Sequence, residues 1–121
     1  RGITTLKVNN DKMNSKLNAI SIVDQYLEHA RVMIFHNNGN EKVYISSADW
    51  MVRNLDHRIE VAVPINDKVI KKELIDIINI QLKDNQKARV LDASLMNKYV
   101  PLKGRKYKSQ EETYLYLKGK K

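Results

Sequence analysis

The sequence predicts an α/β fold in which a small mixed β-sheet is flanked by helices. Short runs rich in β-branched residues recur along the chain, and one run is separated from the next by the turn Asn37–Asn40. The stretch Asn66–Lys83 instead carries apolar residues at helical spacing. Because strand and helix signals alternate, we expect layers of sheet and helix within one domain, which suits a chain of 121 residues.

The N-terminal part is predicted to contain one strand, one loop and one short helix. Arg1–Val8 is rich in β-branched residues, which favour a strand. Asn9–Asn18 is polar and is expected to form a loop. Apolar residues of Ala19–Leu27 fall on one face of a helix, so a short helix is predicted there.

A β-hairpin is the clearest strand signal. Ala30–Phe35 is an apolar run bounded by polar residues, and Lys42–Ser47 is the return strand. The Asn and Gly residues between the two runs tolerate positive φ at low cost, as a tight turn requires. The sequence therefore predicts two antiparallel strands joined by a short turn.

The hairpin is expected to lead into a short helix and a third strand. Asp49–Leu55 is the predicted helix, with Ser46 or Ser47 as its N-terminal cap. His57–Ile65 alternates apolar and polar residues, which is typical of a strand with one buried face. Pro64 limits how far this strand can pair.

The strongest helix signal is Asn66–Lys83, with Asn66 or Asp67 as the predicted cap. Its apolar stripe is expected to pack on one face of the sheet. A polar linker, Asp84–Arg89, and a helical turn near Ala93–Asn97 are predicted to follow. The stripe consists of Ile70, Leu74, Ile77, Ile78 and Leu82.

The C-terminal part is predicted to be a loop followed by a helix. Tyr99–Lys108 contains a proline and a glycine among basic residues, which favours a loop. Ser109–Leu117 is the final helix, with Ser109 as cap and Glu112 completing a capping box.

The formal net charge of +8 is concentrated at the C-terminal end. Residues 1–97 carry 14 Lys and Arg against 12 Asp and Glu, whereas residues 98–121 carry 8 against 2. We therefore divide the domain into a main part, residues 1–100, and a basic loop with its helix, residues 101–121. A polyanionic partner and a merely solubilising tail both explain this basic end.

Composition also excludes some classes of protein. The chain has no cysteine, which rules out disulfide frameworks and thiolate metal sites. No apolar run is long enough to cross a bilayer and no signal-peptide pattern opens the chain, so a cytoplasmic protein is expected, with membrane association as a second option. The opening Arg1-Gly2-Ile3 resembles the middle of a strand, so we expect a piece of a longer polypeptide.

His29 is the histidine best positioned for chemistry. It precedes the first hairpin strand, and Arg31 follows two residues later. Residues i and i+2 of a strand share a face, so the imidazole and the guanidinium are expected to project together. Such a pair suits phosphate chemistry, because the cation holds the anion while the imidazole moves a proton. A half-buried histidine in an ion-pair cluster with Glu28 is the plainer interpretation, and the residues alone favour it.

Other polar side chains lie at the ends of the predicted strands. Ser46, Ser47 and Asp49 follow the second hairpin strand, where hydroxyls and helix-start amides can hold phosphate oxygens, but a simple helix cap is the plainer interpretation and the residues alone favour it. Glu60 can orient a histidine or pair with Arg58. Trp50 is expected in the core or as a pocket wall, while His36 and His57 are expected at the surface. No metal-ligand spacing is present.

These residues resemble one half of a phospholipase D-type phosphotransfer site, but only loosely. That superfamily has Lys where Arg31 stands, Asp where His36 stands and Gly-Ser-x-Asn at the position of residues 46–49. The resemblance is much closer to the C-terminal domain of bacterial polyphosphate kinases. It rests on YLEHARV at residues 26–32 and VYISSADWMVRNLDHRIEVAVPI at residues 43–65, and it extends over nearly the whole chain.

The resemblance implies a mechanism and a set of ligands. In the family, a histidine in a preceding domain takes the γ-phosphate of ATP, and the phosphoryl group passes to a growing polyphosphate chain. His29 matches the second active-site histidine, which acts as an acid or base and contacts nucleotide, and Arg1 matches an arginine that contacts nucleotide phosphate. Arg31, Ser46 and Ser47 are expected to contact ATP or polyphosphate as well.

The same resemblance implies that some parts of the machinery lie elsewhere. The Mg²⁺ ligands and the phosphorylated histidine are expected in upstream domains of the same polypeptide, in an enzyme that is a homo-oligomer. This piece alone is therefore expected to be inactive, because a covalent cycle needs a nucleophile as well as an acid or base. Two alternatives remain open at this point: a phospholipase D-like phosphodiesterase or nuclease half-site acting as a dimer, and a non-catalytic polyanion-binding module using Lys103–Lys108.

Overall fold

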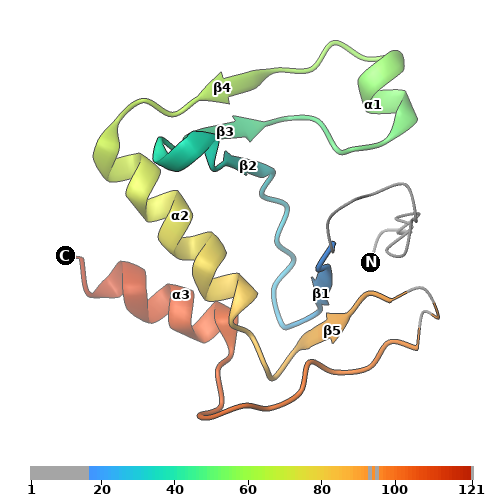
Figure 1. Cartoon of the computed structure of the whole chain (residues 1–121), viewed down its shortest axis with the longest axis vertical. Helices are drawn as coiled ribbons and strands as arrows, with labels where there is room; N and C mark the ends of the chain where they lie inside the picture. Colours follow the sequence, from blue (N-terminus) through green and yellow to red (C-terminus); the bar gives the residue numbers. More distant parts are fainter. Residues whose placement is uncertain (1–16, 93, 95, 121) are drawn as a thin grey trace. The chain divides into compact units, whose positions relative to one another are not determined.

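The computed structural model describes residues 17–92, 94 and 96–120 (Figure 1). These residues form two compact units, one comprising residues 28–78 and the other comprising the residues on either side of that range. The described elements are, in chain order, β1 (Ile20–Ile22), β2 (Val32–Phe35), a 3₁₀ turn (Asn37–Gly39), β3 (Lys42–Ser46), α1 (Val52–Asp56), β4 (Ala62–Pro64), α2 (Lys68–Leu82), β5 (Ala88–Val90) and α3 (Ser109–Lys118). The α/β class is confirmed, with the described strands paired antiparallel in one three-stranded and one two-stranded sheet.

The hairpin forms as predicted. Strand β2 pairs antiparallel with β3, with Met33 opposite Tyr44 and Phe35 opposite Lys42. The turn between them has positive φ at Asn37, Asn38 and Gly39, with values of 44°, 53° and 85°. Asn and Gly are the residues that adopt this left-handed region at least cost, so the turn sequence sets the register of the hairpin.

The segment after the hairpin differs from its prediction in two respects. Helix α1 begins at Val52 with Met51 as its N-cap, and no side chain caps it. The predicted caps are wrong because both hydroxyls are already engaged: Ser46 Oγ accepts the N–H of Ala48, and Ser47 Oγ accepts the N–H of Val61. Strand β4 is also shorter than predicted, since its ladder with β3 covers only Ala62–Pro64.

Helix α2 confirms the strongest helix signal. Asp67 Oδ1 accepts hydrogen bonds from the backbone N–H groups of Val69 and Ile70, both at 2.9 Å, and so caps the helix as predicted. Within the predicted stripe Ile70 and Leu82 are exposed, while Ile80, which lies outside it, is the buried side chain of the helix.

In the other unit, β1 occupies the range for which a short helix was predicted, and that prediction is wrong. Strand β1 pairs antiparallel with β5, placing Ile20 opposite Val90 and Ile22 opposite Ala88. The apolar spacing fits a helix as well as a strand over so few residues, and the distant partner decides between them. Strand β5 likewise starts inside the predicted polar linker. The predicted strand Arg1–Val8 lies outside the described residues, as does most of the predicted loop Asn9–Asn18.

The buried carboxylate of Asp84 connects three segments of this unit. Its side chain is only 1% exposed. Oδ1 accepts the N–H groups of Gln86, Lys87 and Ala88 at 2.9, 2.7 and 2.9 Å, and Oδ2 accepts the N–H of Ser109 at 2.7 Å. Asp84 therefore ties the end of α2 to β5 and to the first residue of α3.

Asp84 also explains why the predicted capping box is absent. The N-cap of α3 is Lys108, which makes no side-chain cap bond, and the Ser109 N–H is satisfied by Asp84 instead. The carboxylate of Glu112 binds the guanidinium of Arg105 through two hydrogen bonds of 2.9 and 3.1 Å. The loop from Tyr99 to Lys108 is confirmed, apart from one bridge between Tyr99 and Arg89.

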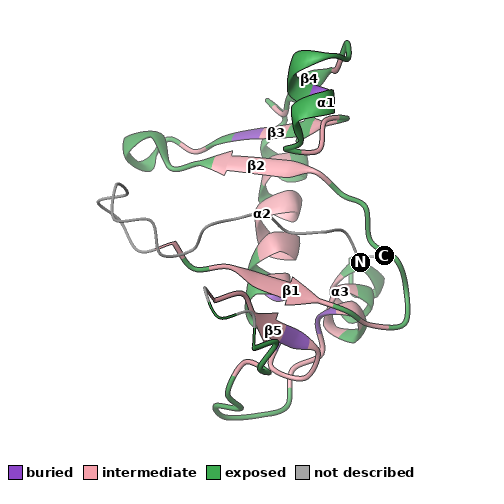
Figure 2. Cartoon of the chain, turned by 90° about the vertical axis from the view of Figure 1, so that its right-hand side faces the viewer, coloured by how far each residue is buried: buried purple, intermediate pink, exposed green. Residues whose placement is uncertain are grey.

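The core of the described part is small. Among the described residues, the buried apolar side chains are those of Val43, Ile80 and Ala88, and Figure 2 shows how little of each element is buried. Large apolar side chains on the flanks of helix α1 lie in solvent, since Trp50 is 80% exposed and Ile59 is 101% exposed. No helix in the described ranges is both long enough and apolar enough to span a membrane.

Candidate active site

A chain of contacts joins His29, Arg31 and Asp49 at the end of the hairpin. Arg31 Nη2 lies 2.7 Å from His29 Nε2, and Arg31 Nε donates to Asp49 Oδ1 at 2.6 Å. His29 Nε2 is 3.6 Å from the same carboxylate oxygen. The prediction that the imidazole and the guanidinium project together is confirmed.

The hairpin register positions these groups. His29 and Arg31 precede β2, and Asp49 follows β3. The N–H of Ser46 donates to the carbonyl oxygen of Arg31 at 2.9 Å, which extends the ladder beyond the strand and holds the two segments together. Asp49 thereby comes within reach of Arg31 although 18 residues separate them in the sequence.

The contact between Arg31 and His29 depends on the tautomer of the imidazole. A guanidinium only donates hydrogen bonds, so His29 Nε2 accepts this one when the neutral ring carries its proton on Nδ1. With a proton on Nε2, the partner of that nitrogen is instead the Asp49 carboxylate, 3.6 Å away. The same ring nitrogen thus has a donor and an acceptor within reach.

The charges of Arg31 and Asp49 stabilise each other. The hydrogen bond from Arg31 is the main reason that the pKa of Asp49 is lowered below its usual range, with smaller contributions from the charges of Arg31 and His29. The bond to Asp49 likewise raises the pKa of Arg31. Arg31 therefore stays cationic and Asp49 stays anionic over the whole physiological pH range.

Glu60 organises a second group of polar side chains. It accepts hydrogen bonds from Ser47 Oγ and from Asn54 Nδ2, the latter at 2.7 Å. These two bonds lower the pKa of Glu60, and the charges of Arg58 and Arg31 lower it further. Asn54 is 3% exposed, so the amide fixes the carboxylate from the buried side. Glu60 thus makes its hydrogen bonds with Ser47 and Asn54 rather than with a histidine.

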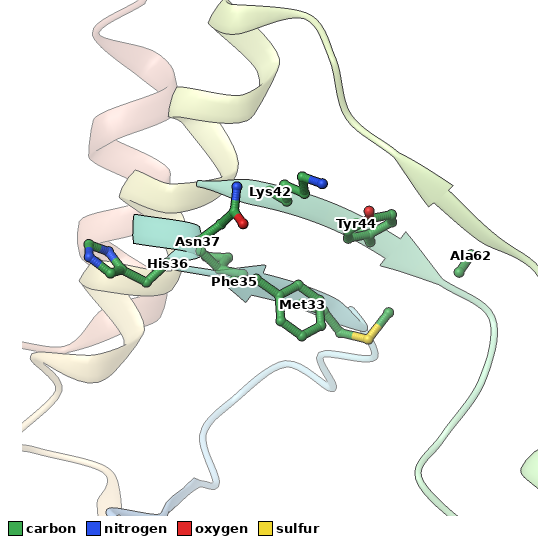
Figure 3. Close-up of a pocket in the computed structure, with 8 residues that line it drawn as sticks. Met33, Phe35, His36, Asn37, Lys42, Tyr44 and Ala62 are labelled. Carbon is green, nitrogen blue, oxygen red and sulfur yellow. The ribbon is translucent and has the colours of Figure 1, made fainter. Parts of the chain in front are cut away.

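Two shallow hollows lie along this unit. One of about 370 Å³ is lined by Arg31, Ser46 and Asp49, with Trp50 as a wall. The other, of about 790 Å³, lies over the far end of the hairpin, and Met33 borders both (Figure 3). In the second hollow the rings of Phe35 and Tyr44 meet edge to face, with their centroids 5.9 Å apart.

The remaining sequence candidates fall outside the cluster. Arg1 lies outside the described residues. His36 caps the exposed turn of the hairpin and His57 ends α1, both at the surface as expected. The role of Asp49 as carboxylate partner of Arg31 was missed. The hairpin register indicates this role, because it pairs residue 46 with residue 31 and so brings Asp49 close to Arg31.

An α/β unit that presents an imidazole, a guanidinium and anchored carboxylates at one end of a hairpin is suited to handling phosphate groups. The family model described as polyphosphate kinase C-terminal domain 2 matches residues 1–111 of this chain. The chain therefore belongs to the polyphosphate kinase C-terminal domain family, and the resemblance read from the sequence is confirmed.

Individual relatives agree with the family match. The polyphosphate kinases of Vibrio parahaemolyticus serotype O3:K6 and of Escherichia coli strain K12 are each 50% identical over 120 residues, which is 98% of this chain and 17% of each relative. A crystal structure of polyphosphate kinase from Porphyromonas gingivalis superimposes with a TM-score of 0.83 at 49% identity, covering 87% of this chain and 16% of that one. The chain thus spans about one sixth of the length of the relatives it matches.

Proposed function

We propose that this chain acts as the C-terminal domain of a polyphosphate kinase and that His29 is the proton-handling group of its phosphoryl transfer. The contact chain from Asp49 through Arg31 to His29 is the observation that carries the proposal. The relatives matched over nearly the whole chain are named polyphosphate kinases, which supplies the reaction. The substrates proposed are ATP and a polyphosphate chain, in the cytoplasm.

The proposed reaction moves one phosphoryl group in two steps. The bond between the γ-phosphorus of ATP and its bridging oxygen breaks, a bond from phosphorus to a histidine nitrogen forms, and ADP leaves with the bridging oxygen. A terminal oxygen of the polyphosphate chain then attacks the phosphorus and releases the histidine. The resemblance to polyphosphate kinases implies that the phosphorylated histidine lies in a part of such a kinase that this chain does not cover.

Arg31 supplies positioned charge in this scheme. A guanidinium has five N–H donors, and the contacts to His29 and Asp49 use two of them. The remaining donors are available to oxygens of the transferring group, whose charge must be stabilised in the transition state. Asp49 fixes the plane of the guanidinium, because the short bond to Nε leaves it little freedom to rotate.

His29 supplies proton transfer beside that charge. In the tautomer whose Nε2 lone pair faces Arg31, an incoming phosphate that engages the guanidinium also meets an unprotonated nitrogen. That nitrogen can take the proton from an attacking phosphate hydroxyl and return it to the leaving oxygen in the reverse reaction. The side chain of His29 is 67% exposed, which leaves room for substrate.

A protein-held Mg²⁺ does not fit the described part of this site. The two site carboxylates, Asp49 and Glu60, are engaged by Arg31 and by Ser47 and Asn54. No group of three or more His, Asp or Glu side chains suited to a metal occurs among the described residues. We therefore propose that Mg²⁺ enters with the ATP phosphates and is liganded elsewhere in the kinase.

The experiment is a substitution of His29 by Ala in a polyphosphate kinase that carries this chain as its C-terminal domain. Polyphosphate synthesis from ATP should fall on the order of 100- to 10,000-fold, the usual contribution of a general acid or base. The melting temperature should stay unchanged because the side chain is exposed. His57→Ala is the matched control, since it removes another exposed imidazole, at the end of α1. Synthesis by His29→Ala at the rate of His57→Ala would overturn the proposal.

A further inference from the structure

The loop between β5 and α3 is strongly basic and is not used by the proposed transfer site. Residues 98–108 contain five Lys or Arg side chains and no acidic one. The loop belongs to a different compact unit from His29. The proposed transfer reaction does not account for these five positive charges. The contacts of the loop indicate which kind of ligand they can bind.

The half-buried residue Asn85 anchors the main chain of this loop. Asn85 Oδ1 accepts the N–H of Tyr107 at 2.7 Å, and the Asn85 N–H donates to the Tyr107 carbonyl at 3.0 Å. Asn85 Nδ2 also donates to the carbonyl oxygen of Arg105 at 2.9 Å. Gly104 makes the bend with a φ of 74°. The main chain of the loop is therefore anchored at Arg105 and Tyr107, although the loop has almost no regular secondary structure.

Two of its five cations are neutralised within the unit. Arg105 forms the two hydrogen bonds to Glu112, and Lys108 lies 2.8 Å from Glu111 and 3.7 Å from Asp24. Lys98, Lys103 and Lys106 are exposed, and no described residue forms an ion pair with any of them. An anchored main chain thus presents three lysines whose charge is open to a partner.

The aromatic residues of the loop argue for a polyanion without bases. A surface that binds single-stranded nucleic acid offers aromatic faces on which bases stack. Here the guanidinium of Arg89 lies 3.3 Å from the centroid of the Tyr99 ring, and that of Arg105 lies 4.8 Å from that of Tyr107. The chain's own cations therefore cover one face of each ring, which reduces the aromatic surface on which bases can stack.

We propose that Lys98, Lys103 and Lys106 form a second polyphosphate-binding surface, which holds a linear polyphosphate chain at residues 98–106 with residues other than those that transfer the phosphoryl group. The proposal rests on the proposed function for the identity of the anion. Three exposed ammonium groups on one loop suit a ligand that carries a negative charge on every repeating unit. Binding at this surface should retain long chains through successive transfers without touching the reacting phosphorus.

The test uses the 121-residue chain and the kinase that carries it, with long linear polyphosphate as the probe. The variant K103A/K106A removes two open charges, and K68A/K83A removes two exposed lysines of α2 and its end as a control for net charge. The loop variant should bind long polyphosphate on the order of tenfold more weakly at low salt, while the control binds like the parent. The slope of log affinity against log salt concentration should become less negative by about 1.4 in this variant. Each of the two lost phosphate contacts contributes about 0.7 to that change.

Two further measurements make each outcome decisive. K103R/K106R, which keeps the charges, should restore binding, and failure to do so would contradict a charge-based surface. Single-stranded DNA at equal phosphate concentration should bind more weakly than polyphosphate, and equal binding would overturn the assignment of the ligand.

In the kinase, K103A/K106A should shorten the chains made while leaving the first transfer to a short primer unchanged. Loss of that first transfer would instead place these lysines in the transfer site.

Discussion

Replacing Asp84 by Asn should destabilise the fold far more than any change at an exposed acid. Both oxygens of Asp84 accept backbone N–H groups, three on Oδ1 and one on Oδ2, and the side chain is 1% exposed. An asparagine amide can keep the three bonds on its oxygen but turns its NH₂ group toward the N–H of Ser109. The lost bond, the buried donor without a partner and the lost charge together cost about 2–4 kcal/mol.

The effect should depend on pH in a defined direction. Burial acts to raise the pKa of Asp84, but the N–H groups of Ser109, Lys87 and Ala88 outweigh it, so the net pKa is lowered in the folded state. A lowered folded pKa adds stability that is fully present above the unfolded value of about 3.9 and is lost as pH falls through the folded pKa. Below pH 4 the parent should therefore lose this contribution while D84N does not, and the difference between them should shrink.

Urea unfolding of the 121-residue chain, followed by circular dichroism at pH 7 and at several values below pH 4, measures both effects. Asp56→Asn is the matched control, because Asp56 is exposed at the end of α1. A D84N variant within about 0.5 kcal/mol of the parent at pH 7, the range of ordinary surface changes, would refute the reasoning. A difference that stays constant down to pH 3 would refute the assignment to the ionised carboxylate.

Two further predictions concern the site and are read as rates of polyphosphate synthesis in the kinase. Arg31→Lys keeps the charge but lacks the planar guanidinium that bonds His29 and Asp49 at the same time, so the rate should fall on the order of 100-fold. A rate equal to that of the parent would show that charge alone suffices. Glu60→Ala frees Ser47 and the loop before β4 and should slow transfer by up to about 100-fold. Glu60→Gln should retain most of the rate. Equal losses in both variants would show that the charge of Glu60 is required, rather than its hydrogen bonds.

Local signals predicted the hairpin and α2 well. The Asn-Asn-Gly turn adopts the positive φ values that its residues tolerate, and Asp67 caps α2 through two bonds to its own first turn. In both cases the deciding interactions lie within a few residues of each other. The i and i+2 relation also sufficed to place His29 beside Arg31.

Distant partners explain the failures. Strand β1 is three residues long and is defined by pairing with β5, so nothing within residues 19–27 distinguishes it from a helical turn. The start of α3 is satisfied by Asp84, 25 residues earlier, rather than by a local capping box. Asp49 reaches Arg31 only through the register of β2 and β3, which is why its role became clear in three dimensions alone.

The most direct test of the central claim is rescue of the His29→Ala variant of the kinase by free imidazole. The His29 side chain is 67% exposed, so a small base can enter the space that the substitution leaves beside Arg31. Polyphosphate synthesis should recover with increasing imidazole and should follow the concentration of its unprotonated form, while Arg31→Ala shows no such recovery. Equal responses of the two variants, or none at any imidazole concentration, would contradict a proton-handling role for His29.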